Sequence, residues 1–277
     1  MARTCAGAVT EQEGEAAAPN LSGMCRAIAL LRALALTTCV LPVTLAAAQP
    51  PAEEATQMAT LTIRWWGQAC FTISDGTRTV LVDPFPADFG YKVPDIEPQV
   101  VLVTHEHRDH NAVDAVKGQP TVLLGPGPHP AAGLSILGVA AFHDAEHGAK
   151  RGPDTIFAWE MAGLKLVHLG DLGHVLTDEQ IAAIGPPVDV LMIPVGGYYT
   201  IDATQAVQVS EQLRARIILP MHVRTEALAR LPIAPVDDFL QALPQGWELQ
   251  QPTAPTLTLK HDDVPTAGCR VIVLPYE

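Results

Sequence analysis

Basic residues are scarce in this chain of 277 residues, which has 17 Lys and Arg against 30 Asp and Glu and a formal net charge of −13. A protein that binds nucleic acid mainly through its phosphates carries a stripe or patch of basic side chains. The sequence contains no such stripe, so nucleic acid is not an expected partner. The hydrophobic fraction of 48% is ample for a core, and the length allows one large domain or two small ones.

Cysteine is also rare, and three of the five cysteines precede residue 49. The other two, Cys70 and Cys269, do not form a pair with the close spacing of a zinc site. They allow a single disulfide in an oxidising compartment, and the sequence does not decide between that bond and two free thiols. Cys70 lies within an apolar strand pattern, which favours a buried, small hydrophobic side chain.

The apolar stretch near the N-terminus, residues 33–45, is shorter than the ~20 residues that a membrane span needs. Two arginines precede it and the alanines 46–48 follow it, which is the order of a secretory signal peptide and its cleavage site. Residues 24–48 therefore predict an exported protein, periplasmic or secreted, without a stable membrane anchor. Its mature chain is expected to begin at Gln49.

The chain is thus predicted to consist of three parts. Residues 1–48 are an N-terminal extension plus signal peptide, residues 49–59 a polar linker, and residues 60–277 a single hydrolase domain. The three glutamates among residues 11–15 do not suit the basic start of a signal peptide. The start of translation therefore stays open between Met1 and Met24.

A cluster of metal-binding side chains occupies the sequence Thr104-His105-Glu106-His107-Arg108-Asp109-His110. Residues 99–103 contain a short, continuous apolar run, which predicts a buried strand just before the cluster. Asn111 is the expected N-cap of a short helix just after it. The end of a strand before a helix is a usual place for a functional site in an α/β fold.

The spacing within this cluster indicates a metal site. His105 and His107 are two residues apart in an extended segment, so their side chains point the same way and can bind one ion. Asp109 and His110 lie beyond the bend and can face a second ion. Imidazole and carboxylate ligands suit zinc, and also manganese or iron.

Beyond residue 60 the hydrophobic pattern predicts an α/β domain. Expected strands are 61–65, 69–73, 79–82, 99–103, 121–124, 138–142, 155–161, 164–169, 188–195, 216–219, 256–259 and 270–274. Expected helices are 177–184, 202–214 and 236–243, and residues 125–128 are expected to be a rigid loop. Besides the cluster, three expected strands end at His143, Asp171 and His222, and these strand ends support one another as parts of one site.

These residues make the chain similar to the metallo-β-lactamase fold superfamily over about residues 60–277. Residues 105–110 match its His-x-His-x-Asp-His signature. The chain most resembles a branch of uncharacterised zinc-dependent hydrolases that is itself similar to the ascorbate-6-phosphate lactonase-like group. That similarity rests on Asp83-Pro84, His143-Asp144, Arg151-Gly152, His168-Leu169-Gly170-Asp171, Ile193-Pro194-Val195-Gly196-Gly197 and Ile218-Leu219-Pro220-Met221-His222. The resemblance implies a four-layer αβ/βα sandwich with a two-metal site at one edge.

The resemblance also implies a set of ligands for two divalent ions. Zn²⁺ is the expected metal, with Mn²⁺ or Fe²⁺ as alternatives. The first ion would be held by His105, His107 and His143, and the second by Asp109, His110 and His222. Asp171 would bridge both ions. Residues 142–147 depart from the Gly-His-Thr-Pro-Gly motif of hydroxyacylglutathione hydrolases, so His147 is an alternative to His143.

Such a site implies a metallo-hydrolase in which a hydroxide bridging two metals attacks a small ester, lactone or phosphoester. Asp109 and Asp171 are the predicted catalytic carboxylates, and Asp109 can both orient the hydroxide and receive a proton. True β-lactamases of this fold lack the bridging carboxylate, so Asp171 argues against that activity. The expected partner is a small-molecule substrate, and the oligomeric state stays open.

Four further residues are candidates for contacts around the metals or the substrate: His174, Arg151, Tyr198 and Thr200. His174 could hold a ligand carboxylate. Arg151 could pair with an anionic group of the substrate, or with Asp144 or Asp154. Tyr198, Thr200 and the intervening tyrosine could help to stabilise an oxyanion, although an ordinary surface position fits the two tyrosines equally well.

Two alternative functions compete with this prediction. The first is a nuclease or phosphodiesterase of the same fold, which the shortage of basic residues and the export signal disfavour. The second is a non-catalytic metal-binding member of the superfamily, which the complete set of ligands disfavours.

Overall fold

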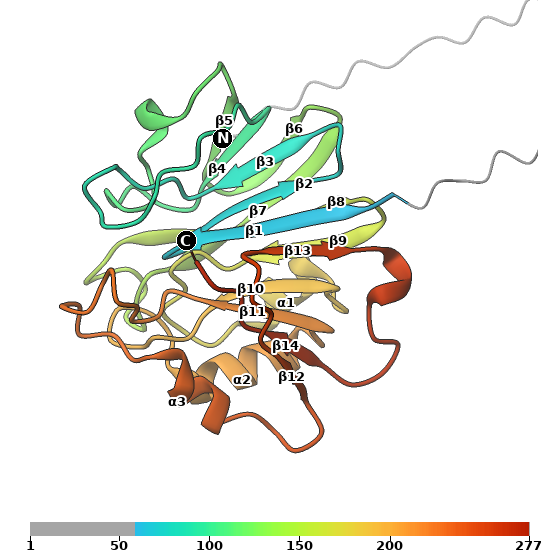
Figure 1. Cartoon of the computed structure of the whole chain (residues 1–277). Coiled ribbons are helices and arrows are strands. Elements are labelled where there is room, and N and C mark those ends of the chain that lie inside the picture. Colours follow the sequence, from blue (N-terminus) through green and yellow to red (C-terminus); the bar gives the residue numbers. More distant parts are fainter. Residues whose placement is uncertain (1–58, 277) are drawn as a thin grey trace, which may run out of the picture. The chain divides into compact units, whose positions relative to one another are not determined.

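The computed structural model describes residues 59–276 of the chain. The expected signal peptide and most of the expected linker lie outside the described residues. Two β-sheets pack against each other, and three short α-helices lie beside the second sheet (Figure 1). Over the described range, no helix is long and apolar enough to cross a membrane.

The first sheet has six strands in the spatial order β13-β1-β2-β3-β4-β5. Their bounds are β1 Leu61–Gly67, β2 Cys70–Ser74, β3 Thr79–Val82, β4 Val100–Val103, β5 Thr121–Leu124 and β13 Thr256–Leu259. The strands from β13 to β3 pair antiparallel, whereas β3, β4 and β5 are parallel. All four residues of β4 are buried, as its continuous apolar run predicts for a central strand.

The second sheet has eight strands in the order β12-β14-β11-β10-β9-β8-β7-β6. Their bounds are β6 Gly127–Ala131, β7 Leu134–Phe142, β8 Pro153–Met161, β9 Leu164–His168, β10 Val190–Pro194, β11 Ile217–Met221, β12 Glu248–Gln250 and β14 Arg270–Ile272. Strands β9, β10, β11, β14 and β12 are parallel, and β6 to β9 form an antiparallel meander.

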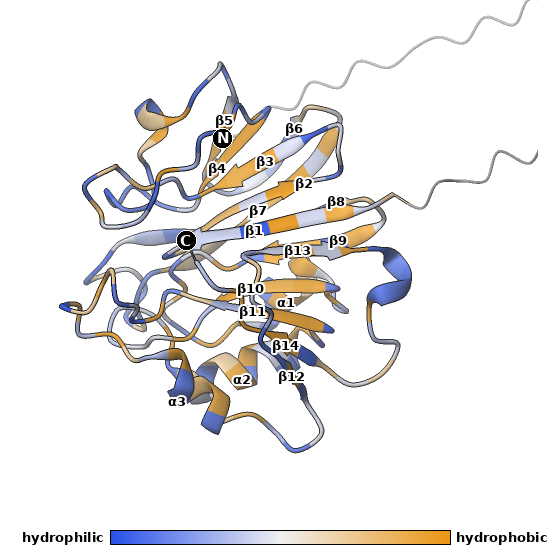
Figure 2. Cartoon of the chain, viewed as in Figure 1, coloured by the Kyte–Doolittle hydropathy of each residue, from blue (hydrophilic) through white to orange (hydrophobic). Residues whose placement is uncertain are grey.

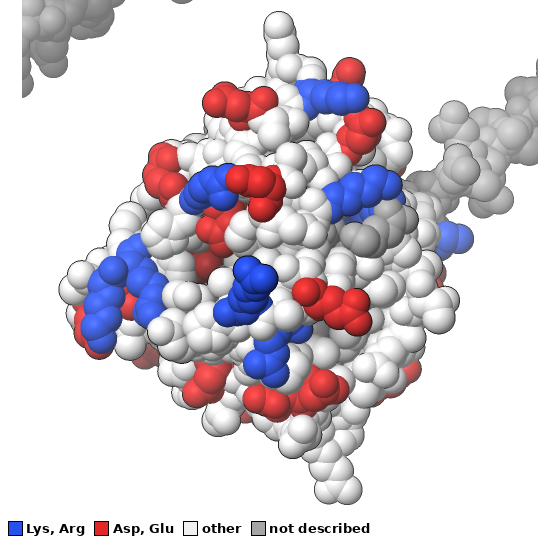
Figure 3. Space-filling model, turned by 60° about the vertical axis from the view of Figure 1, so that its left-hand side comes forward, with Lys and Arg blue, Asp and Glu red and all other residues white. Residues whose placement is uncertain are grey.

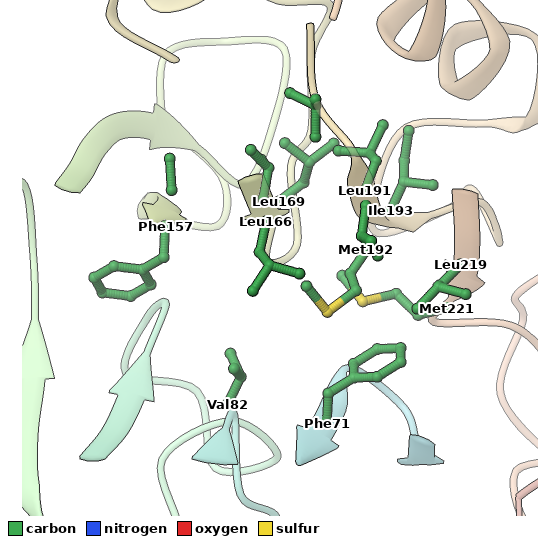
Figure 4. Close-up of a cluster of buried hydrophobic side chains, with 14 of the residues drawn as sticks. Phe71, Val82, Phe157, Leu166, Leu169, Leu191, Met192, Ile193, Leu219 and Met221 are labelled. Atoms are coloured by element: carbon green, nitrogen blue, oxygen red, sulfur yellow. The ribbon is translucent and has the colours of Figure 1, made fainter. Parts of the chain in front are cut away.

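The main hydrophobic core lies between the two sheets. Figure 4 shows Phe71 and Val82 of the first sheet pointing toward Leu166, Met192 and Met221 of the second. Each is at most 1% exposed, and burying a large side chain of this kind contributes about 1.5–3 kcal/mol. Figure 2 colours many residues of the strands as hydrophobic and many residues of the connecting loops as hydrophilic.

The helices α1 (Asp178–Ile184), α2 (Ala203–Gln212) and α3 (Val236–Gln241) bury apolar side chains in the same core cluster. The expected cap at Thr177 is confirmed, because its hydroxyl accepts from the backbone N–H of Gln180. The side chain of Gln180 accepts in return from the backbone N–H of Thr177, which completes a capping box.

The fold class is confirmed as α/β with two packed sheets, but the layer outside the first sheet is thin. A second apolar cluster covers that face and includes Cys70, Phe85, Tyr91 and Leu228. The side chains come from the strands, from the loop after β3 and from the segment before α3. Within residues 59–276 a 3₁₀ turn, η1 (Val113–Ala115), is the one helical element between β4 and β5.

Three local expectations are corrected by the structure. Asn111 caps no helix, because η1 is preceded by Ala112 and the Asn111 side chain donates to Glu106 instead. The expected loop at residues 125–128 runs into strand β6, and strand β12 was not expected. The open question about the two cysteines is answered as well, since Cys70 and Cys269 are both free and buried.

Candidate metal centre

Four strand ends carry the predicted ligands into one place. Strand β4 leads to His105 and His107, β7 to His143, β9 to Asp171 and β11 to His222. Although β4 belongs to the first sheet and the other three strands to the second, their ligands come together. The site is therefore built at an edge that both sheets share.

The seven predicted ligands form two groups of three with one carboxylate between them. The side-chain nitrogens of His105, His107 and His143 lie within 4.8 Å of one another. The same holds for the ligand atoms of a second group: Asp109, His110 and His222.

The carboxylate between the groups belongs to Asp171. Its Oδ2 lies 3.1 Å from Nε2 of His143, 3.1 Å from Nε2 of His222 and 3.3 Å from Nε2 of His110. A single oxygen thus faces one histidine of the first group and two of the second. This is the placement expected of a ligand that both groups share.

The residues fit a bound divalent cation. Nε2 of His105, Nε2 of His110 and Oδ1 of Asp171 are buried and have no hydrogen-bond partner among the described residues. Leaving such polar atoms unpaired costs free energy, and a cation would satisfy them. Imidazole nitrogen and carboxylate oxygen suit zinc, manganese and iron.

The electrostatic surroundings prepare these side chains for a cation. Burial lowers the pKa of His105 to about 3, helped by the nearby His110, so the His105 ring is neutral. Burial acts to raise the pKa of Asp171, but His110 and His222 outweigh it and hold that pKa well below the usual range. Asp171 is therefore ionised.

His110 behaves differently from the other histidines. Burial alone would lower its pKa, but the carboxylates of Asp171 and Asp83 raise that pKa well above the usual range. A proton on His110 has to leave before Nε2 can bind a cation. Acidic pH therefore opposes metal binding at the second group of ligands.

Asp83 holds His110 in place, a role that was not predicted from the sequence. Its buried carboxylate accepts from the backbone N–H of Thr104 at 2.8 Å and from the Thr104 hydroxyl at 2.7 Å. Its Oδ2 also lies 2.9 Å from Nδ1 of His110. Because that contact places the ring proton on Nδ1, Nε2 is left to bind a cation. The feature that could have indicated this role is the position of Asp83 at the end of β3, the strand that pairs with β4.

Replacing Asp83 with asparagine is expected to weaken metal binding by about 10–100-fold while the fold is kept. The amide oxygen would still accept from Thr104, so the amide NH₂ would face Nδ1 of His110 and move the ring proton to Nε2. Titration of each protein against a fluorescent zinc chelator measures the loss. Asp88→Asn is the matched control, because the Asp88 side chain is 69% exposed and pairs with Arg108. Equal affinities in the two variants would contradict this role of Asp83.

Asp154 and Gln68 also support ligands and were not identified from the sequence. The buried Asp154 carboxylate lies 3.5 Å from Nδ1 of His105 and accepts from the backbone N–H of Asp171 at 3.4 Å. Burial, and then the charge of Asp171, raise the Asp154 pKa well above the usual range. Gly170 has a φ of +56°, and a side chain there would collide with Asp154.

Gln68 joins the first sheet to the ligands of the second group. Its side-chain N–H donates to Oδ2 of Asp109 at 2.9 Å, and its backbone oxygen accepts from the N–H of His222 at 3.0 Å. Gln68 lies just after β1. The hydrophobic pattern of that strand did not indicate that Gln68 would contact Asp109.

The other candidates divide into those that line the site and those that do not. Nε2 of His174 accepts from the N–H of Phe142 at 3.2 Å, and its Nδ1 lies 2.9 Å from the Val175 carbonyl oxygen, so the structure does not place it on a ligand carboxylate. Tyr198 is 65% exposed. The hydroxyl of Thr200 donates to the backbone oxygen of Ile201, its own chain neighbour. Neither residue lines the cavity described next.

A cavity of about 410 Å³ opens onto the ligands. Its walls comprise Gln68, Phe89, His107, Arg108, Asp109, His143, Arg151, Asp171, Tyr199, His222 and Leu231. His143 therefore faces the cavity, whereas the alternative ligand His147 is exposed and packs its ring against Phe142, 5.6 Å between centroids. The geometry favours His143.

Known proteins resemble the chain over this same region. A family model described as "Beta-lactamase superfamily domain" matches residues 62–222. A UPF0173 metal-dependent hydrolase of Thermoplasma volcanium is 32% identical over 189 residues, which cover 59% of this chain and 83% of that protein. A relative of the same description from Thermoplasma acidophilum is 32% identical over 200 residues, or 62% and 88% of the two chains.

A crystal structure from Thermotoga maritima is also similar. It is assigned to the Zn-dependent hydrolases of the metallo-β-lactamase superfamily, with 35% sequence identity and a TM-score of 0.62. The match covers 77% of this chain and 98% of the other.

Proposed function

The chain belongs to the metallo-β-lactamase superfamily and is a metal-dependent hydrolase, and we propose that it cleaves a small ester, lactone or phosphoester at a site for two divalent ions. The observation that carries the proposal is the arrangement of the ligands. Two groups of three ligands converge on Asp171, whose oxygen faces both. Zn²⁺ is the metal that we propose, and Mn²⁺ or Fe²⁺ would suit the same ligands.

Divalent ions at such a site supply Lewis acidity and make water acidic enough to act as a nucleophile near neutral pH. The protein supplies the ligands, their orientation and a proton acceptor. Asp109 suits the last role. Burial acts to raise its pKa, but the His110 ring, whose Nε2 lies 3.4 Å from Oδ2 of Asp109, holds that pKa below the usual range. Gln68 fixes the orientation of the Asp109 carboxylate, which can accept a proton from water.

The cavity supports a small substrate. Its volume of about 410 Å³ lies in the usual range for small-molecule sites. Figure 3 shows acidic and basic side chains interspersed on the face that it draws, without a broad basic patch for a nucleic acid. We also propose that both groups share Asp171 as a ligand, and a shared carboxylate of this kind disfavours a true β-lactamase.

A screen of lactones, thioesters and phosphodiesters with the zinc- or manganese-loaded protein tests the proposal. We expect hydrolysis of at least one class, its loss on treatment with a chelator and its return when metal is added back. A loaded protein that hydrolyses none of these compounds would favour the non-catalytic alternative. Binding of RNA or DNA that weakens steeply with salt would favour the nuclease alternative.

A further inference from the structure

One cationic side chain in the cavity wall has no acidic partner among the residues that the structure describes. The guanidinium of Arg151 donates to the backbone oxygen of Tyr198 at 3.0 Å and lies 5.4 Å from the ring centre of Tyr199. Within residues 59–276 no carboxylate lies at ion-pair distance from it. Its positive charge is therefore available to whatever enters the cavity.

The backbone at Arg151 is firmly held. The buried carboxylate of Asp144 accepts from four backbone N–H groups, those of Glu146, Gly148, Lys150 and Arg151, at 2.7–2.9 Å. Burial acts to raise the Asp144 pKa, but these four donors hold it at about 2. The Asp144 carboxylate therefore stabilises the loop after β7 through these backbone hydrogen bonds and does not neutralise the Arg151 side chain. The loop thereby presents the Arg151 side chain to the cavity.

The second arginine of the cavity wall provides a contrast. Arg108 forms an ion pair with both carboxylate oxygens of Asp88, and both side chains are mostly exposed. Its charge is therefore already balanced, and water screens it. Arg151, in contrast, is half-buried and its hydrogen-bond partner is a neutral carbonyl.

We propose that Arg151 is the specificity-determining residue of this site and that the substrate carries an anionic group, a carboxylate or a phosphate, besides the bond that is cleaved. The inference rests on the proposed function, since it names the substrate class for that hydrolase. The planar guanidinium offers paired N–H donors that match two oxygens of such an anion. The same wall includes Phe89, Tyr199 and Leu231, whose side chains could contact an apolar part of the substrate.

Titration calorimetry of the metal-loaded protein tests this with three probes that contain no ester bond: glutarate, propylphosphonate as the counterpart of a phosphate, and the neutral glutaramide. Arg151→Gln is expected to lower the affinity for the preferred anion at least about tenfold, because a hydrogen bond to a charged group is lost. Glutaramide should bind equally to both proteins. The anion that loses more affinity identifies the group as carboxylate or phosphate.

Two further variants separate a specific contact from a general effect of charge. Arg108→Gln removes the same charge from the same cavity wall, and we expect it to change anion binding less than about threefold. Arg151→Lys keeps the charge but loses the paired donors, so its affinity should lie between those of the wild type and Arg151→Gln. Anionic substrates from the screen should lose about tenfold in kcat/KM in Arg151→Gln, and neutral ones should keep theirs.

The outcomes distinguish this inference from the proposed function. If hydrolysis is found but Arg151→Gln binds both anions like the wild type, or no worse than Arg108→Gln does, the inference is overturned and the hydrolase stands. Failure of the wild type to bind either anion overturns it as well. If Arg151→Gln loses anion binding while no compound is hydrolysed, the anion site stands and the hydrolase does not.

Discussion

Replacing Asp171 with alanine is expected to remove at least one metal ion and nearly all hydrolysis while the fold is kept. One oxygen of Asp171 faces histidines of both ligand groups, so its charge would be shared by two cations. Without it, two like charges at close range repel each other with less compensation. Losing the ions would remove several kcal/mol of transition-state stabilisation, which corresponds to a rate at least about a thousandfold lower.

The conservative variant Asp171→Asn separates charge from shape. It fills the same buried space but carries no negative charge, so it should resemble Asp171→Ala in metal content and rate. Circular dichroism should show the wild-type fold in both variants, because the core strands do not depend on this carboxylate. A fully active Asp171→Asn would mean that the negative charge is not what the site needs.

The second large effect concerns His143. Its ring lies 4.9 Å from that of His105 and 5.0 Å from that of His107, and it is 2% exposed. His143→Ala is therefore expected to lose the ion of the first ligand group and about a thousandfold or more in rate. The rate on the best substrate of the screen and the metal content of the purified variant measure the effect.

His147→Ala is the matched control for this variant. His147 is exposed, and its φ of +55° lies in the left-handed region, where histidine is found more often than alanine, so circular dichroism accompanies the measurement. We expect wild-type metal content and a rate within about threefold of the wild type, since surface substitutions change little. If His147→Ala loses the metal and His143→Ala does not, the assignment of the first group is wrong.

The candidate ligands could be identified from the sequence because they lie at or soon after the ends of strands. The cluster at residues 104–110 follows a buried apolar run, and His143 and His222 directly follow strands β7 and β11. A histidine or carboxylate at the end of an apolar run can be recognised within a short segment of sequence. Their assignment to two ions needed the resemblance to a known superfamily, because spacing alone does not show which strand ends meet.

The residues that orient the ligands could not be predicted in the same way. Asp83 reaches His110 across 27 positions of sequence, and Gln68 reaches Asp109 across 41. Those contacts depend on the order of strands in the first sheet and on its packing against the second. The availability of Arg151 depends likewise on Asp144, which could have been its partner but binds four backbone N–H groups instead.

The metal content of wild-type protein and of Asp171→Ala, purified side by side without chelator and measured by elemental analysis, tests the central claim most directly. The two ligand groups and their shared carboxylate predict about two divalent ions per wild-type chain and at most one per variant chain. A wild-type protein that holds almost no metal even after zinc or manganese is added, or an Asp171→Ala protein that keeps both ions, would contradict it.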